Sequence, residues 1–477
     1  MERVITNKPS TWNGDSFRII LLVVATVVAV YGFPRLGLPA IVNRLLFVLI
    51  LFRAYSTKDD LFWLTWYFIL LDAPGRLFSA GSGAEVFRLP IYSVGPGISA
   101  TFQELFLIVY LIKELRWRTK TRFIFKNHSW LLLLIASVYI GISFILGISF
   151  QNLISTIRMI LPWSWLLLLP RYIKTKDDLS RVYYMLAPMV ILAFVTMIQS
   201  YITNNFLHDL LAGTGRTYLT FEASEYALSR ISSAGFVTFF CIMLSLYYLT
   251  EIKNNINRNY LILITALGSI ATVVSGTRGW IIGLFIMYLS SLFLTGFGMF
   301  RQVIRFVAVF GILAVILVNV FPVLASQSVL AFERVETLGA LAQGDLTAEG
   351  TLSRLTVRGP RVMAAFRESP VIGWGFSDKF WQHADMHVGN QTNLLNLGIA
   401  GFIPFNLLFF SICFITFRQG RKLHLLYNKG NSYVVFLFAL FALFAIHSSS
   451  TMLWAYVTSA QLFWALIFSS INVELSA

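Results

Sequence analysis

Long apolar runs separated by short polar segments recur along nearly the whole chain. An α-helix needs roughly 20 consecutive apolar residues to cross a hydrocarbon core about 30 Å thick. The evenly spaced alternating segments of a membrane β-barrel are not part of this pattern. We therefore predict an all-α polytopic bundle of fourteen membrane-spanning helices, near residues 17–33, 38–53, 60–73, 99–113, 130–150, 153–169, 182–201, 231–250, 260–275, 280–296, 303–324, 397–417, 431–447 and 452–471.

The composition favours the same fold class. Of the 477 residues, 57% are hydrophobic and only 12% are charged, whereas a soluble domain carries about 25% charged residues. Most of the protein surface is therefore expected to face lipid. Because the chain has no internal repeat, low-complexity tract or soluble-domain linker, we predict one polytopic membrane domain over residues 1–477.

The positions of lysine and arginine predict the orientation, since cytoplasmic loops carry an excess of both. We place the basic segment 113–126 in the cytoplasm and let the spans alternate. The basic clusters at 171–181, 253–258, 301–305 and 418–429 then fall in the cytoplasm as well, and so do both termini. These loops explain the formal net charge of +15, so we expect no nucleic-acid partner.

Three longer segments then face the outer side: 74–98, 202–230 and a large loop at 325–396. Arginine is disfavoured on this side, yet several arginines map there, namely Arg216, Arg230, Arg278, Arg334, Arg354, Arg358, Arg361 and Arg367. A guanidinium fork binds phosphate or pyrophosphate through two parallel hydrogen bonds. A polyanionic ligand is therefore the simplest explanation. Arg354, Arg358 and Arg361 have the spacing of one helical face.

Two stretches assigned to the outer side hold candidate anion sites, one in a short turn and one in the longer segment 202–230. The turn Ser275-Gly276-Thr277-Arg278-Gly279 connects two predicted spans and would hold Arg278 at headgroup depth. The alternative is a tight turn whose arginine only extends toward water. Arg216 and Glu222 lie in a short polar stretch, 215–226, ahead of the next span. A solvated loop with no specific role explains that stretch equally well.

The end of the large loop contains a candidate base, His387, directly before an apolar span. A histidine exchanges a proton near neutral pH, as a general base must. One alternative is a purely structural histidine. Another is a metal site at His383, Asp385 and His387. Their spacing, however, puts only the two histidines on one helical face, and no distant cluster offers further ligands.

Together these stretches resemble the O-antigen ligase and polymerase family of bacterial polysaccharide assembly, over residues 210–410. Thr277-Arg278-Gly279 is similar to the family's outer turn. Arg354 and the stretch Pro370-Val371-Ile372-Gly373-Trp374-Gly375 are similar to its loop arginine and Pro-x-x-Gly-x-Gly pattern. His387 and Gly398 have the spacing between the family's loop histidine and its Gly-hydrophobic-x-Gly helix start.

The chain also departs from the family pattern at several positions. Val388 follows the histidine where an asparagine is usual, and Asn390 comes two residues later. Asn396 is nearest to the position of a common acidic residue, and Leu219 stands where glycine is frequent. Glu222-Ala223-Ser224 is similar to the Glu-Pro-Ser-aromatic pattern of repeat-unit polymerases but lacks the proline.

The resemblance implies a GT-C-like glycosyltransferase of the bacterial inner membrane, with its active site on the periplasmic side and no metal or other cofactor. Its donor would be an undecaprenyl-pyrophosphate-linked glycan. Arg216 and Arg278 would hold the diphosphate and stabilise the charge on the leaving group. His387 would take the proton from the acceptor sugar. Further candidates for substrate binding are Arg230, Arg354 and Glu222.

Three functions fit these residues. A polymerase would transfer the growing chain to a new lipid-linked repeat unit, with a chain-length regulator as a candidate partner, and Glu222-Ala223-Ser224 favours this interpretation. A ligase would pass the finished chain to lipid A core or to a protein. A lipid-linked glycan transporter would place ionisable groups at membrane depth, and Arg158, inside a predicted span, is the main such residue.

Overall fold

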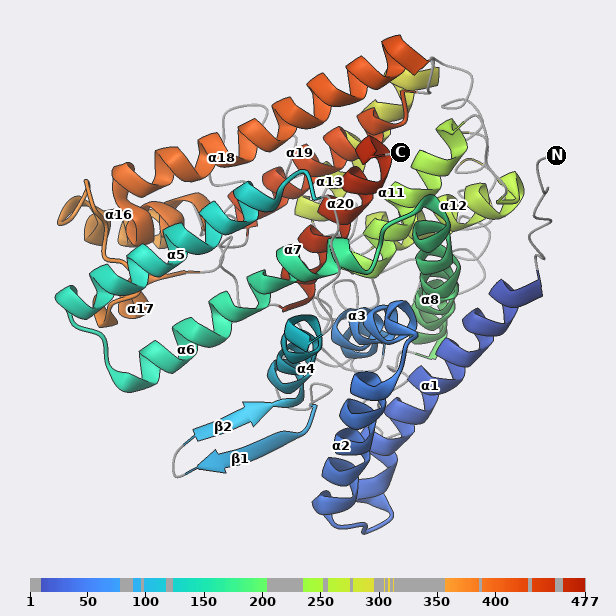
Figure 1. Ribbon diagram of the computed structural model, residues 1–477, viewed down its shortest axis with the longest axis horizontal. Helices are drawn as coiled ribbons and strands as arrows, with labels where there is room; N and C mark the ends of the chain where they lie inside the picture. Colours follow the sequence, from blue (N-terminus) through green and yellow to red (C-terminus); the bar gives the residue numbers. More distant parts are fainter. Residues whose placement is uncertain are drawn as a thin grey trace.

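The computed structural model of the chain describes residues 10–77, 89–95, 98–116, 123–203, 235–251, 256–274, 278–295, 357–385, 388–427, 431–450 and 458–476, with the single positions 304, 308 and 312. Helices make up nearly all of these residues (Figure 1). The strands among them are β1 (Ile91–Gly95) and β2 (Ile98–Thr101), which pair antiparallel as one hairpin. The predicted all-α class is confirmed for this part of the chain.

Within the described ranges, three N-terminal helices precede the hairpin along the chain, and one follows it. They are α1 (Ser10–Arg35), α2 (Ala40–Ser56), α3 (Asp60–Leu77) and, after the hairpin, α4 (Phe102–Arg116). A capping box starts α4: the Glu104 N–H donates to Thr101 Oγ1 at 3.3 Å, and the Thr101 N–H donates to Glu104 Oε2 at 2.6 Å. This exchange satisfies two donors at the start of the helix. Figure 1 shows the hairpin projecting beyond the helices here.

In the middle of the chain, two long helices, α5 (Lys126–Leu146) and α8 (Lys176–Thr203), are connected by shorter helical segments that are interrupted by 3-10 turns. The connecting elements are α6 (Phe150–Ile160), the 3-10 turn η1 (Leu161–Ser164), α7 (Trp165–Leu168) and the 3-10 turn η2 (Leu169–Arg171). Pro162 and Pro170 lie at the starts of η1 and η2. Because proline has no N–H to donate, regular α-helical bonding stops at both places.

The C-terminal half supplies the centre of the bundle. Its described elements are α11 (Phe236–Thr250), α12 (Arg258–Val274), α13 (Arg278–Thr295), α16 (Gly359–Arg367), α17 (Asp378–His383), α18 (Gly389–Tyr427), α19 (Tyr433–Ser450) and α20 (Thr458–Ser476). α11 is apolar all round and is buried over 236–248, as expected of a central helix. α20 packs against α3, α7, α11, α18 and α19.

Each predicted span that the structure describes overlaps a helix, although some ends differ. Span 303–324 lies outside the described residues apart from single positions. α20 ends at Ser476, beyond the predicted end at 471. α18 starts at Gly389, ahead of the predicted start at 397, and is broken at Gly398, where φ is 59°.

Within the described residues, four helical stretches are long and apolar enough to cross a membrane. They are Lys126–Leu146, Phe150–Arg171, Lys176–Gln199 and Gly389–Leu426. Large apolar side chains are also exposed on the outside of the bundle, for example Phe17, Leu49, Ile145 and Phe414. Large apolar side chains exposed on many helices are typical of contact with lipid. The protein is therefore a helical membrane protein.

Ion pairs join helix ends that the sequence assigns to the cytoplasm. Arg181 bonds Asp15 at 2.7 Å and Asp59 at 2.9 Å. Lys176 contacts Glu251 at 2.9 Å and Glu474 at 3.2 Å. Two further pairs are Lys113 with Asp60 and Arg171 with Glu114. Residues near both ends of the chain thus contact segments assigned to the same side.

Candidate functional site

Most of the site residues predicted from the sequence lie outside the described residues. These are Arg216, Glu222, Arg230, Arg354 and His387. Arg278 is the first residue of α13, and only its backbone is described. The structure does describe both flanks of His387, up to Asp385 and from Val388 onward. The surroundings of these flanks form the best-defined part of the candidate site.

The segment ahead of His387 is docked on the turn between α5 and α6 through Asp378. The Asp378 N–H donates to the Gly147 carbonyl at 3.0 Å. Its Oδ1 accepts from the Ser149 N–H at 2.8 Å and from Asn152 Nδ2 at 2.7 Å. These hydrogen bonds, the Ser149 backbone bond first, hold the pKa of the Asp378 carboxyl below its ordinary value because they favour the charged form.

Two more bonds extend this docking along α5 and α6. The Phe376 N–H donates to Ser143 Oγ at 2.6 Å, and Trp381 Nε1 donates to Thr156 Oγ1 at 3.3 Å. Figure 1 shows α16 and α17 beside the ends of α5 and α18. The end of the large predicted loop is thus attached to three helices of the bundle.

The two glycine-containing stretches of the family resemblance contact each other. The Trp374 N–H donates to the Leu395 carbonyl at 2.8 Å, and the Gly375 N–H donates to the Asn396 carbonyl at 2.9 Å. In return, the Ile399 and Ala400 N–H groups donate to the carbonyls of Pro370 and Val371, both at 2.9 Å. The stretch 370–375 therefore satisfies backbone groups that the break in α18 at Gly398 leaves free.

Glycine is required on both sides of this contact. Gly373 and Gly398 have φ angles of 75° and 59°, a left-handed region that side chains disfavour. A Cβ on Gly373 would lie 2.5 Å from the Asn396 carbonyl oxygen, and one on Gly398 would overlap the Gly373 nitrogen. The Gly-x-Gly and Gly-hydrophobic-x-Gly spacings therefore have a structural role.

Tyr139 of α5 fills the space left by two other glycines of the same stretches. Its hydroxyl donates to the Leu397 carbonyl, the last one before the break. A Cβ on Gly401 would lie 2.6 Å from Tyr139 Cζ, and one on Gly375 would lie 2.8 Å from the Tyr139 carbonyl oxygen. α5, the loop end and α18 thus meet at Tyr139, which contacts Gly401 through its ring and Gly375 through its backbone carbonyl.

Asp385 connects α16 to the segment that leads into α18. Its side chain is 9% exposed and lies 3.3 Å from Arg361 Nη2 and 3.6 Å from Arg358 Nη1. Thr392 Oγ1 donates to the Asp385 carbonyl at 2.7 Å. The predicted shared face of Arg358 and Arg361 is confirmed, while Arg354 lies outside the described residues. Both guanidinium groups remain partly exposed, and Asp385, their partner, lies two positions ahead of His387 in the sequence.

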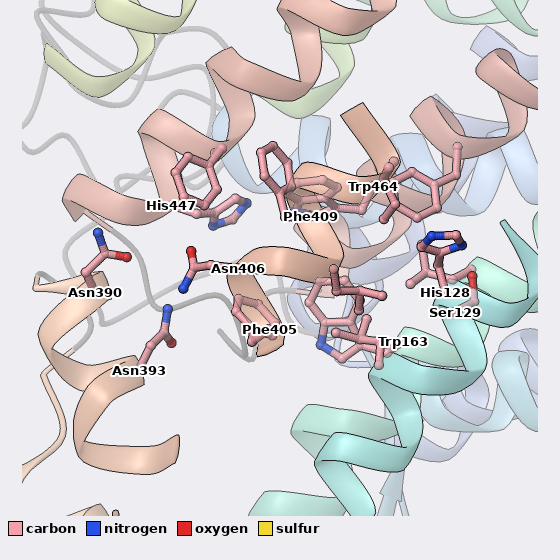
Figure 2. Close-up of a pocket in the computed structure, with 16 residues that line it drawn as sticks. His128, Ser129, Trp163, Asn390, Asn393, Phe405, Asn406, Phe409, His447 and Trp464 are labelled. Atoms are coloured by element: carbon pink, nitrogen blue, oxygen red, sulfur yellow. The ribbon is translucent and has the colours of Figure 1, made fainter. Parts of the chain in front are cut away.

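A cavity that is partly open to the surface follows the N-terminal part of α18, and the space inside it, including the open part, is about 610 Å³. Its polar side chains form two groups at opposite ends (Figure 2), with Asn390, Asn393, Asn406 and His447 at one end and His128 and Ser129 at the other. The rings of Trp163, Phe405 and Phe409 lie between them. The amide end is next to the segment that carries His387, since Gly389 is the first residue of α18.

Asn393 is the most informative of these polar residues. It is 4% exposed, and its Oδ1 has no hydrogen-bond partner among the described residues. A buried oxygen left in this state costs about 1–3 kcal/mol. A hydroxyl or water in the cavity would remove that cost. Amides at one end and aromatic walls along the length suit an amphipathic ligand with hydroxyl groups near α18 and an apolar portion further in.

A buried carboxylate also fixes the end of the outer segment 202–230. Asp72 of α3 is 3% exposed, and its Oδ2 accepts the Val237 N–H at 2.9 Å, at the start of α11. Gly235 precedes that helix, and a Cβ there would lie 2.7 Å from Asp72 Cγ. The negative charge is favourable at a helix N-terminus. Asp72 thus anchors the start of α11, the helix that follows the segment containing Arg216 and Arg230 in the sequence.

Sequence reasoning missed Asp72, Asn393, Asn406 and His447 as site residues. These residues could have been found because each is polar or ionisable and lies inside or beside an apolar run. Such a residue is costly in a membrane unless it has a function or a partner. Asn390 and Asn396 were noted only as departures from a family pattern. Asn396 Nδ2 donates to the Gly375 carbonyl at 2.6 Å, which gives it a structural role.

The rival metal site concerned His383, Asp385 and His387. His383 ends α17, while Asp385 pairs with the two arginines of α16. Within the described part of the chain, no three His, Cys, Asp or Glu side chains gather as metal ligands. Cys241 and Cys413 are both free and buried in that part of the chain.

Comparison with known protein-family models and with curated proteins gave no match for this chain.

Proposed function

We propose that the chain is a membrane glycosyltransferase that polymerises undecaprenyl-pyrophosphate-linked repeat units of a surface polysaccharide. The observation that supports this most is the contact between the stretch 370–375 and the break in α18 at Gly398. Two motifs of the O-antigen ligase and polymerase resemblance contact each other there. They flank His387 in sequence, and the second lies in α18 between Asn393 and Phe405, which line a cavity that suits an amphipathic ligand.

In the proposed reaction, a hydroxyl of the acceptor sugar attacks the anomeric carbon of the donor glycan. The new glycosidic C–O bond forms as the bond from that carbon to the diphosphate oxygen breaks, and the diphosphate leaves with the electron pair. The hydroxyl proton passes to the imidazole of His387. Arg216 and Arg278 neutralise the diphosphate as its charge grows, so the leaving group needs no proton.

Arg278 has a backbone position compatible with this role. It begins α13, and the first N–H groups of a helix together with its dipole attract anions. A guanidinium on the same residue adds a bidentate phosphate ligand. Arg230, Arg354 and Glu222 are proposed as further substrate contacts from the neighbouring outer segments.

The proposed topology has fourteen spans in a GT-C-like arrangement in the bacterial inner membrane, with both termini cytoplasmic and the site periplasmic. Two sets of contacts support it. The ion pairs of Arg181 and Lys176 join segments assigned to the cytoplasm. Asp378 joins the end of the large outer loop to the turn after α5, which is assigned to the same outer side.

Purified protein supplied with lipid-linked repeat unit alone tests the function. A polymerase forms a ladder of lipid-linked oligomers, because donor and acceptor are the same molecule. If product forms only after lipid A core is added, the protein is a ligase instead. If no product forms with any acceptor, the glycosyltransferase proposal is wrong. A chain-length regulator added to the assay should narrow the ladder without being needed for it.

Transport is less well supported. Arg158 was the main ionisable residue within a predicted span, and its Nε lies 2.8 Å from Glu104 Oε1. An ion pair formed with the start of α4 gives this charge a local partner, so no translocated substrate is needed to explain it.

A further inference from the structure

A second cavity, separate from the one beside α18, lies between α3, the start of α4 and η1. The space inside it, including the part that is open to the surface, is about 600 Å³. Its polar walls are made by Tyr67, Thr101, Gln103, Glu104 and Arg158. None of these residues belongs to the site proposed above.

The polar groups of this cavity are held in place by their neighbours. Arg158 pairs with Glu104 at 2.8 Å, and its Nη2 donates to the Ser99 carbonyl. The second carboxylate oxygen of Glu104 accepts the Thr101 N–H in the capping box of α4. Sites whose groups are fixed in advance bind with less loss of conformational entropy.

The charge of the walls selects the class of ligand. Arg158 and Glu104 neutralise each other, and the other polar residues carry no charge. A phosphate or carboxylate would meet the Glu104 carboxylate as well as the guanidinium. A neutral ligand with adjacent hydroxyls avoids this conflict, because one hydroxyl accepts from the guanidinium while its neighbour donates to the carboxylate. The 38% exposure of the Arg158 side chain leaves it within reach of such a ligand.

We propose that this cavity binds a neutral sugar unit of the glycan, held by hydroxyl groups that bridge Arg158 and Glu104. The inference rests on the proposed function, because it assumes that the protein handles a glycan. It places a recognition subsite at the base of the β1–β2 hairpin, around an arginine that the sequence places inside a predicted span. Its role is to bind the glycan, with no part in the bond-forming step.

Cysteine protection tests the subsite without any turnover. In a background with Cys241 and Cys413 replaced by alanine, Gln103→Cys is labelled with a small maleimide. The competing probe is the oligosaccharide released by mild acid from the host strain's surface polysaccharide. We expect this saccharide to slow labelling, and we expect Arg158→Gln or Glu104→Gln to abolish the protection. Glutamine at 104 keeps an oxygen for the Thr101 N–H, so α4 keeps its cap.

The matched control is Arg171→Gln, which removes another arginine–glutamate pair, that with Glu114, on the side assigned to the cytoplasm. The saccharide should still protect Gln103→Cys from maleimide in this control variant. Arg158→Lys, which keeps the charge but loses the fork, should retain partial protection if the protein is folded. Protection by inorganic phosphate instead of saccharide, or by neither, would overturn the subsite.

Kinetics separate this proposal from the proposed function. For the lipid-linked repeat unit, Arg158→Gln should raise KM roughly 10- to 100-fold, from the loss of hydrogen bonds to a charged group. The value of kcat should change little, because the contact is the same in ground and transition states. A ladder with unchanged KM contradicts the subsite alone. Saccharide protection in a protein that transfers nothing contradicts the proposed function alone.

Discussion

Gly373 and Gly398 lie backbone to backbone, so closely that a Cβ on either residue would overlap the backbone nitrogen of the other. Both have left-handed φ angles. Gly373→Ala or Gly398→Ala should therefore lower the free energy of unfolding by more than about 1 kcal/mol, from backbone strain and lost hydrogen bonds. Thermal unfolding in detergent measures the effect.

Gly141→Ala is the matched control for these glycine variants. Gly141 lies within α5, and a Cβ there would meet nothing within 4 Å. Alanine in a helix interior is favoured over glycine by about 1 kcal/mol, so stability should be unchanged or slightly higher. Equal losses in all three variants would show that the contact between Gly373 and Gly398 has no special role.

His387→Ala should lower transfer by about 10²–10⁴-fold, the usual contribution of a general base. Arg278→Ala should lower it by about 10²–10³-fold, through lost stabilisation of the leaving diphosphate. Ladder formation from lipid-linked repeat units measures both effects. His424→Ala, near the other end of α18, should keep full activity. Normal product from the His387 variant would exclude that residue as the base.

Asp385→Asn should destabilise the protein by about 1–2 kcal/mol, because the carboxylate loses its ion pairs with Arg358 and Arg361 while their exposure screens part of the interaction. Chemical unfolding curves give the difference. Glu368→Gln is the control, since its pair with Lys379 lies at the surface and should be worth less than about 0.5 kcal/mol. A larger loss from the Glu368 variant would contradict this ranking.

Acid should loosen the attachment of α17 to the turn after α5. The folded-state pKa of Asp378 lies below its ordinary value of 3.8. Its stabilising effect is therefore fully present above pH 3.8 and is lost as the pH falls through the lower folded-state pKa. Asp378→Asn should be less stable than wild type near pH 6, and the difference should shrink below pH 4. If the stability difference between Asp378→Asn and wild type does not change with pH, the charged form of Asp378 is not the stabilising species.

Impermeant thiol labelling tests the orientation. In a background without Cys241 and Cys413, Gln382→Cys near Asp385 should react in cells whose inner membrane is intact. Arg421→Cys, in a cluster assigned to the cytoplasm, should react only after the membrane is permeabilised. Both positions are exposed at the protein surface, so access depends on the side of the membrane. The reverse pattern would invert the topology.

Local hydrophobic pattern was enough to predict the helices. An apolar run long enough to span a membrane forms a helix because every backbone group must be satisfied within the segment. The predicted spans accordingly overlap α5, α8, α11 and α19. The ends were less predictable: α20 extends to Ser476, where Glu474 bonds Tyr247 at 2.7 Å. Because Glu474 has a hydrogen-bond partner on another helix, this charged residue can lie within the last turns of an apolar helix.

For the candidate site, the sequence determined which stretches matter but left their arrangement open. It singled out 370–375 and 398–401 as glycine patterns, yet their contact depends on the break at Gly398 and on Tyr139 of α5. Arg158 was noted as an anomaly, and only the fold pairs it with Glu104.

Asp72 and Val237 are 165 positions apart and meet only in the folded bundle. Composition and periodicity are properties of neighbouring residues, so they determine where the helices form and predict which ends face the cytoplasm. Which distant residues share a cavity is decided by packing, because many chain segments compete for each partner and only the complete bundle satisfies them together.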